Sequence, residues 1–269
     1  FPVAVAGRLG AVATADLERR LDGGFGLRNR PGRWFRKRNR GLGRLGAGRG
    51  LAYHRRIHNP AILSPTPMSD NPHAGVPQEF RVPGHQVLTI TGRDAVAFAQ
   101  AQFMNDVAAL PAGHWHWNGW LSPKGRVIAL FALLRFDAET LWLILPDAHA
   151  EDLAAALRRY LFRSKLTLAV RDDLHAHGRF ARPTQASGAT FAIDGDAVEL
   201  DVGGDGGPRT LRIAPTTAAD NAMAAAHWRR FDLQHGLPRL HGEQVEAWTP
   251  QQLSLERLHA FSVKKGCYP

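Results

Sequence analysis

Segments with a regular apolar period are confined to the part of this 269-residue chain that follows residue 86, which limits where a core can form. Residues 1–67 show neither the 3.6-residue period of a helix nor the two-residue period of a strand, so they offer no face for a core. They also hold 14 of the 34 lysines and arginines but only 3 of the 24 acidic residues. The sequence therefore predicts a basic, disordered or non-native extension at 1–67 and a folded region at 68–269.

Several interpretations of residues 1–67 stay open. Arginine clusters neutralise phosphates, so the segment could be an arm that binds RNA. A mitochondrial transit peptide would share the arginines and the scarcity of acids, but it would carry more serine. Met68 is the first methionine and is followed by Ser69 and Asp70, which fits a native start there and an artificially extended reading frame before it. Direct binding of nucleic acid is therefore left open.

Composition excludes some classes of protein. One cysteine excludes a disulfide framework and any multi-cysteine zinc or iron–sulfur site built by this chain alone. No apolar run reaches the ~18–20 residues that cross a bilayer, so we expect no membrane association and a cytoplasmic location. The histidine pairs His114/His116 and His175/His177 each share a strand face but have no evident third ligand, so we predict no metal site.

The folded region alternates strand-like and helix-like segments. Strands are predicted at 87–91, 114–121, 126–136, 140–145, 166–170, 175–180, 190–193, 197–202 and 209–213. Helices are predicted from 93 to 103, over 147–162 and 218–231, and as a short stretch at 251–259. This order lacks the regular βαβ rhythm of a Rossmann domain, so the expected class is α+β, with mixed sheets and packed helices.

Cys267 is the first candidate for chemistry. Lys264 and Lys265 precede it, and two nearby cations favour the thiolate and lower the pKa of a thiol. A nucleophilic or redox-active thiol is one interpretation. A lone cysteine that is merely packed is the other.

The ending Lys265-Gly266-Cys267-Tyr268, read with four upstream segments, resembles the folate-binding YgfZ family. Members of that family are relatives of the glycine-cleavage T-protein, which transfers an aminomethyl group to tetrahydrofolate. The family signature is K-G-C-[FY]-x-G-Q-E, of which this chain supplies the first four positions. The upstream segments are Gln100–Val107, Ser122–Arg126, Tyr160–Thr167 and Gly236–Pro238.

The resemblance implies a fold and a ligand. Its members form a three-part ring around a folate cavity that a small C-terminal β-barrel closes, and we expect that barrel to be missing here. The implied cofactor is tetrahydrofolate or a folate derivative. Trp228 and His85 match aromatic positions that bind the pterin, Gln234 matches a usual glutamate, and Tyr268 belongs to the terminal motif.

The resemblance also implies a function. The catalytic carboxylates of the T-protein match Ala129 and Leu130, and an apolar side chain cannot take a proton. The preferred hypothesis is therefore a folate-binding accessory protein that supports iron–sulfur proteins and tRNA modification, with Cys267 in a thiol or redox role. Its partners would be folate, iron–sulfur proteins and tRNA-modifying enzymes. A folate-dependent aminomethyltransferase and an RNA-binding protein that acts through residues 1–67 are the alternatives, so enzymatic activity is left open.

Overall fold

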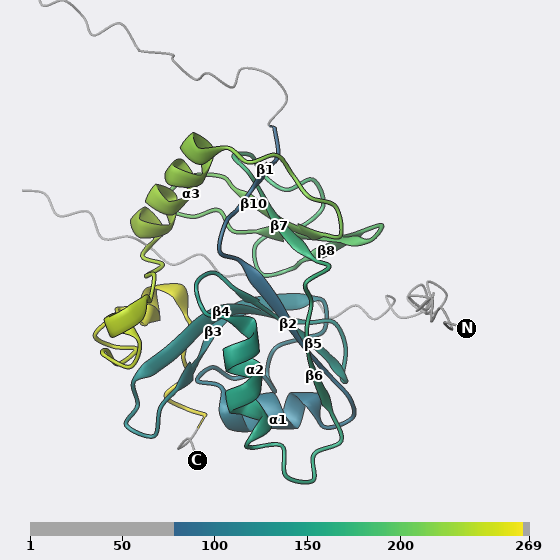
Figure 1. The fold of residues 1–269 in the computed structure, drawn as a ribbon, viewed down its shortest axis with the longest axis vertical. Helices are drawn as coiled ribbons and strands as arrows, with labels where there is room; N and C mark the ends of the chain where they lie inside the picture. The colour runs from purple at the N-terminus through teal and green to yellow at the C-terminus, as the bar shows by residue number, and fades with distance from the viewer. Residues whose placement is uncertain (1–77, 266–269) are drawn as a thin grey trace, which may run out of the picture. The chain divides into compact units, whose positions relative to one another are not determined.

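The computed structural model of this chain describes residues 78–265 (Figure 1). The predicted extension at 1–67 lies outside the described residues. So do Gly266, Cys267 and Tyr268 of the terminal motif.

Two five-stranded antiparallel sheets form the framework. The first sheet has the order β3 (His114–Leu121), β4 (Val127–Arg135), β5 (Thr140–Leu145), β2 (Gln86–Thr91) and β6 (Thr167–Val170). The second has the order β1 (Phe80–Arg81), β7 (His175–Arg179), β10 (Thr210–Ala214), β9 (Ala197–Asp201) and β8 (Ala192–Asp194). The helices are α1 (Ala95–Gln102), α2 (Ala150–Arg158) and α3 (Ala222–His235), with 3-10 turns at Gly242–Gln244 and Leu255–Leu258. The predicted α+β class is confirmed.

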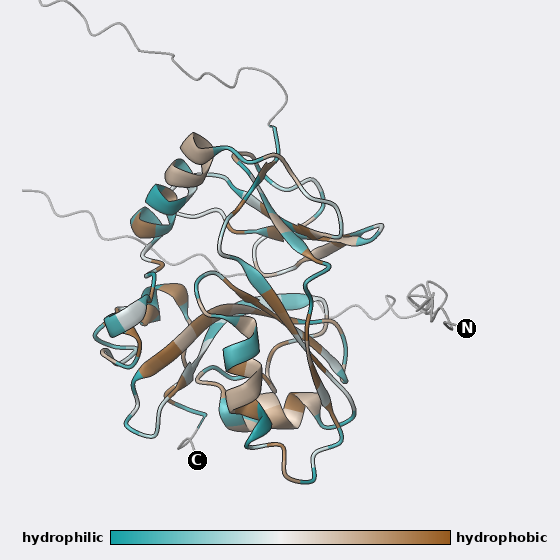
Figure 2. Cartoon of the chain, in the orientation of Figure 1, coloured by the Kyte–Doolittle hydropathy of each residue, from teal (hydrophilic) through white to brown (hydrophobic). Residues whose placement is uncertain are grey.

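The first sheet is apolar on both faces because β4 is an almost unbroken hydrophobic run (Figure 2). Phe131 and Leu133 pack with α1 and α2, whereas Ala132 and Leu134 pack toward the second sheet. Successive residues of a strand point to opposite faces, so one strand supplies two cores.

The second sheet has one apolar face and one polar face. Leu211 and Ile213 of β10 enter the core between the sheets. Arg212, between them, belongs to the other face and pairs with Asp194 at 3.5 Å. The alternation separates an apolar face from a polar one, and part of the polar face is itself buried, since His177 and Glu199, which pair in register with Arg212, are 3% and 6% exposed.

The third core lies under the C-terminal segment that follows α3. Leucines of that segment pack against Met104 and the start of β4, and Figure 1 shows the segment beside β3 and β4. The leucines are Leu237, Leu240, Leu255 and Leu258.

Two predicted boundaries are wrong, and one strand was missed. The helix predicted over 147–162 ends at Arg158, after which the N–H groups of the next three residues bond to carbonyls three positions back, and the backbone is left-handed at Phe162 (φ 44°). The helix predicted from 218 begins after Asn221, whose side chain accepts a hydrogen bond from the Ala224 N–H at 3.0 Å. Strand β1 was not predicted, since two residues carry no period.

Candidate functional site

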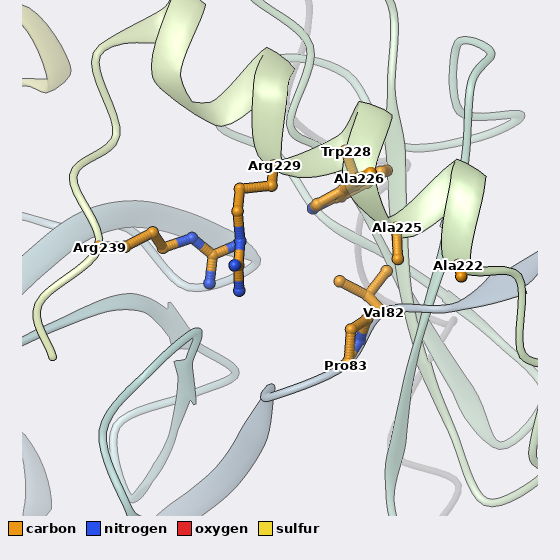
Figure 3. A pocket seen from close by; sticks show the side chains of 8 residues that line it. All are labelled: Val82, Pro83, Ala222, Ala225, Ala226, Trp228, Arg229 and Arg239. Atoms are coloured by element: carbon orange, nitrogen blue, oxygen red, sulfur yellow. The ribbon is translucent and has the colours of Figure 1, made fainter.

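A cavity of about 440 Å³ lies against α3 (Figure 3). Four residues of α3 with the spacing i, i+3, i+4 and i+7 form one wall, so a single helical face points at the cavity. The residues of this wall are Ala222, Ala225, Ala226 and Arg229. Trp228 also contributes, and Val82, Pro83 and Arg239 complete the lining. We call this the α3 cavity.

Trp228 is a wall of the α3 cavity and also part of the core. It is only 3% exposed, and its ring packs edge-on against Phe80 with centroids 5.8 Å apart. The guanidinium carbon of Arg209 lies 4.7 Å from the centre of the indole ring. The core therefore fixes the position of the indole, which borders the α3 cavity with only a small part of its surface.

Arg239 lines the same cavity and is anchored by two buried carboxylates. Its Nη2 donates to Asp232 at 2.5 Å, and its Nη1 donates to Asp147 at 2.9 Å. Arg209 donates to the other oxygen of Asp232 at 2.7 Å. Burial disfavours the charged form, yet Asp232 and Asp147 hold the pKa of Arg239 above its ordinary value. We call Arg209, Asp232, Arg239 and Asp147 the buried ion network.

Arg229 adds a second guanidinium group to the lining. It is exposed, and no ion pair to it is found among residues 78–265. Figure 3 shows the side chains of Arg229 and Arg239 extending toward the same part of the α3 cavity. The cavity lining therefore combines part of an indole with Arg229, a guanidinium that has no ion pair among residues 78–265, and Arg239, whose charge Asp232 and Asp147 balance. The cation at Arg229 suits a ligand that carries a carboxylate.

His85 and Gln234, the other predicted folate-binding residues within the described part, do not line the α3 cavity. His85 is half-buried, and burial, with a smaller effect of Arg239, lowers the pKa of its imidazole to about 4. The imidazole therefore lies near the network that anchors Arg239. Gln234 is exposed in the last turn of α3.

A smaller cavity of about 280 Å³ lies between the start of β4 and the N-terminal half of α2. Ala129 lines it, with Asp147, His149 and Asp152 on its polar side. Asp147 is thus shared, because its carboxylate also anchors Arg239 of the α3 cavity. The position that matches a T-protein carboxylate lies in this second cavity and carries a methyl group.

The C-terminal motif meets the Gln100–Val107 segment, which lies about 160 residues earlier. The ammonium of Lys265 donates to the Phe103 carbonyl, and the Ser262 N–H donates to the Met104 carbonyl at 3.0 Å. The Asn105 amide donates to the His259 carbonyl at 2.7 Å. Burial, partly offset by Asp106, lowers the pKa of Lys265 to about 8. Two segments that carried the family resemblance therefore come together in space.

No cluster of three or more potential metal ligands is found over residues 78–265. In the same part of the chain, every helix is too short or too polar to cross a membrane.

The sequence reasoning missed both arginines of the α3 cavity. Arg239 directly follows the Gly236–Pro238 segment that had been noted, and Arg229 has the same helical spacing as the three alanines of the wall. That spacing was the available signal. Two adjacent arginines on a helix are usually solvated, so the pair Arg229 and Arg230 does not by itself indicate a cavity lining.

Comparison with known proteins finds relatives by sequence, although no family model matches the chain. A "tRNA-modifying protein YgfZ" from Vibrio vulnificus is 26% identical over 202 residues, which cover 68% of this chain and 60% of the relative. One of the same name from Aliivibrio fischeri is 24% identical over 199 residues, with 68% and 61% covered.

A solved structure of the glycine cleavage system aminomethyltransferase T from Bartonella henselae aligns with a TM-score of 0.45 and 14% identity. It covers 58% of this chain and 45% of that one. The chain spans about 60% of the length of the curated relatives it matches. These relatives by sequence confirm the resemblance to the YgfZ family that the motifs predicted.

Proposed function

We propose that this chain is a tetrahydrofolate-binding accessory protein of the YgfZ type that supports tRNA modification and the maintenance of iron–sulfur proteins in the cytoplasm. Relatives named tRNA-modifying protein YgfZ support the first part of this proposal. The α3 cavity supports the folate part.

The observation that carries the folate proposal is the joint lining of one cavity by an indole and two guanidinium groups. A folate has a flat pterin ring at one end and glutamate carboxylates at the other. Aromatic rings pack against indole, and arginine binds carboxylate through paired charge-assisted hydrogen bonds. The volume of about 440 Å³ is in the range of small-molecule sites. We therefore propose that the pterin contacts the part of Trp228 that borders the cavity and that a carboxylate pairs with Arg229, the lining guanidinium without an ion pair.

A binding role is favoured over aminomethyl transfer of the T-protein kind. Ala129 lines the smaller cavity, and Leu130 packs in the core under the C-terminal segment. Neither side chain can accept a proton or hold the amine of the transferred group. We therefore propose no aminomethyl transfer at Ala129 and Leu130.

The proposal also gives a role to the thiol of Cys267. Lys265, two residues earlier, is held at the Phe103 carbonyl, and its pKa is lowered to about 8 by burial. We propose that this placement supports a thiol or redox role for Cys267, with tRNA-modifying enzymes and iron–sulfur proteins as partners.

An anaerobic calorimetric titration with tetrahydrofolate tests the folate proposal. Arg229→Gln is the informative variant, because Arg229 is exposed and its loss should not unfold the chain. A charged hydrogen bond is worth about 1.5–3 kcal/mol, so we expect Kd to rise by roughly 10- to 150-fold. Arg230→Gln is the matched control on the same helix, outside the cavity lining, and should leave Kd unchanged. Absence of binding by the unaltered chain, or equal effects of the two variants, would contradict the proposal.

A further inference from the structure

Phe162 is the most exposed of the large apolar residues in the described part of the chain. Its side chain is 98% exposed, in the loop that joins α2 to β6. Its backbone φ of 44° lies in the left-handed region, which costs a residue with a side chain roughly 1–2 kcal/mol. A phenyl ring in water and a strained backbone are both unfavourable, so the loop keeps a conformation that stability alone does not explain.

Contacts on both sides of Phe162 hold the loop in place, so its phenyl ring projects from a fixed backbone. The Ser164 N–H donates to the Leu161 carbonyl at 2.7 Å, and the Lys165 N–H donates to the Asp94 carboxylate at 2.7 Å. Gly92 permits the close approach of the Lys165 backbone, since a Cβ at position 92 would lie 2.4 Å from the Lys165 carbonyl oxygen. Leu161, the residue before Phe162, packs against the core of the first sheet.

The same loop is strongly basic within a nearly neutral folded region. Residues 158–165 contain four cations and no acid. Arg158 pairs with Glu151 at 3.0 Å, and Lys165 lies near Asp94, whose pKa it helps to lower. Arg159 and Arg163 are exposed, and the described residues offer them no ion pair. Two exposed guanidinium groups without an ion pair among residues 78–265 therefore lie within three residues of Phe162 in the sequence.

This combination fits single-stranded nucleic acid better than a membrane. Arginine pairs with phosphate in a planar fork, and every base has a face on which an aromatic ring can stack. Membrane binding grows with the apolar area that is buried, and one fully exposed phenyl ring beside a 43% exposed tyrosine, Tyr160, contributes little. Tyr160, the nearest other aromatic residue, packs edge-on against Trp120.

We propose that residues 158–165 form an RNA-contact loop, in which Phe162 stacks on one unpaired base while Arg159 and Arg163 bind the flanking phosphates. The choice of RNA as the partner rests on the proposed role in tRNA modification. None of residues 158–165 lines the α3 cavity.

Photo-crosslinking on the full chain tests the loop directly. Phe162 is replaced by the photoreactive p-benzoylphenylalanine, and the probe is unfractionated tRNA at moderate salt. Ile193, which is 60% exposed on β8, receives the same replacement as the matched control. We expect crosslinks from position 162 at several times the yield from position 193. Equal yields would overturn the proposal, because they would show RNA contact that is not specific to residues 158–165.

Affinity measurements add a second readout. Phe162→Ala should weaken tRNA binding roughly 5- to 150-fold, the range measured for loss of one stacked base. Arg159→Gln with Arg163→Gln should lower the salt dependence of binding by about 0.7 per lost phosphate contact. Arg230→Gln should change neither quantity. If these variants bind tRNA normally but no longer bind vesicles of phosphatidylglycerol and phosphatidylcholine, the partner of the loop is a membrane and not RNA. That result would overturn the proposal.

The tetrahydrofolate titration separates this inference from the folate proposal. Phe162→Ala should bind tetrahydrofolate like the unaltered chain. If the folate binds but position 162 does not crosslink, the RNA-contact loop alone is wrong. If position 162 crosslinks but no folate binds, the folate proposal is wrong and the loop stands.

Discussion

Asp232→Asn removes the one carboxylate that joins the two arginines of the buried ion network. Asp232 is 2% exposed and accepts hydrogen bonds from Arg209 at 2.7 Å and from Arg239 at 2.5 Å. An asparagine keeps the shape but leaves the Arg209 guanidinium, which is 2% exposed in its side chain, without a counter-charge. Breaking a buried pair from one side typically costs 3–5 kcal/mol. Arg239 keeps Asp147, so we expect a loss of about 3 kcal/mol in the free energy of unfolding.

Urea unfolding followed by tryptophan fluorescence measures this loss, because Trp228 lies directly under Arg209. Asp220→Asn is the matched control, since the Asp220 side chain is 82% exposed and its pair with Arg81 is 3.4 Å long. That control should change stability by less than about 0.5 kcal/mol. A loss below about 1 kcal/mol for Asp232→Asn, or equal losses for both variants, would refute the reasoning that the network is desolvated and mutually dependent.

Three further predictions concern stability. Burial lowers the pKa of His116 from 6.5 to about 4, so the unfolded chain binds that proton first and stability should fall as pH drops from 6.5 to 4. In urea unfolding between pH 6.5 and 4, His116→Gln should reduce the fall in the free energy of unfolding. An unchanged slope would contradict the assignment of this fall to His116. Gly178→Ala should cost about 1–3 kcal/mol by urea unfolding, because a Cβ would lie 2.8 Å from Phe80 and 2.9 Å from the Trp228 ring. If Gly178→Ala is as stable as the unaltered chain, the side chains around Gly178 are packed less tightly than these distances indicate. Phe162→Asn should keep or slightly raise the melting temperature, since asparagine tolerates the left-handed region, and a clear drop would mean that the ring is packed.

Much of the fold was predictable because strands and helices of this chain carry clear periods. The strand predicted at 140–145 coincides with β5, and the hairpin of β4 and β5 forms as expected. Helix α3 extends four residues beyond the predicted end at 231 and stops before Gly236, where φ reaches 82° and a glycine closes the helix. Local chemistry decides these features, so local sequence reveals them.

The end of α2 was not predictable from its period. Tyr160 and Leu161 continue the apolar spacing of that helix, yet the backbone leaves the helix after Arg158 and Tyr160 is 43% exposed. Contacts with the turn at Gly92 fix the loop, and those depend on a residue that is about 70 positions away. A tertiary contact overrides the local pattern here.

Some residues of the candidate site could be predicted from the sequence, and others could not. Trp228 was chosen from a resemblance, and it lines the α3 cavity. Asp147 and Arg239, 92 positions apart, gave no signal, because charged residues in sequence are usually interpreted as solvated. Their burial depends on two sheets and a C-terminal segment coming together, which no single segment encodes. The roles of Cys267, Tyr268, His85 and Gln234 stay predictions.

The most direct test of the central claim fills the α3 cavity and measures tetrahydrofolate binding. Ala226→Leu adds three carbon atoms at a lining position of α3 that is exposed, so the variant should fold. Ala155→Leu makes the same change at an exposed position of α2 that lines neither cavity. In anaerobic calorimetry, we predict that Ala226→Leu abolishes tetrahydrofolate binding or weakens it at least about tenfold, a loss of about 1.4 kcal/mol, while Ala155→Leu binds like the unaltered chain. Equal affinities of the two variants would contradict the claim that this cavity holds the folate.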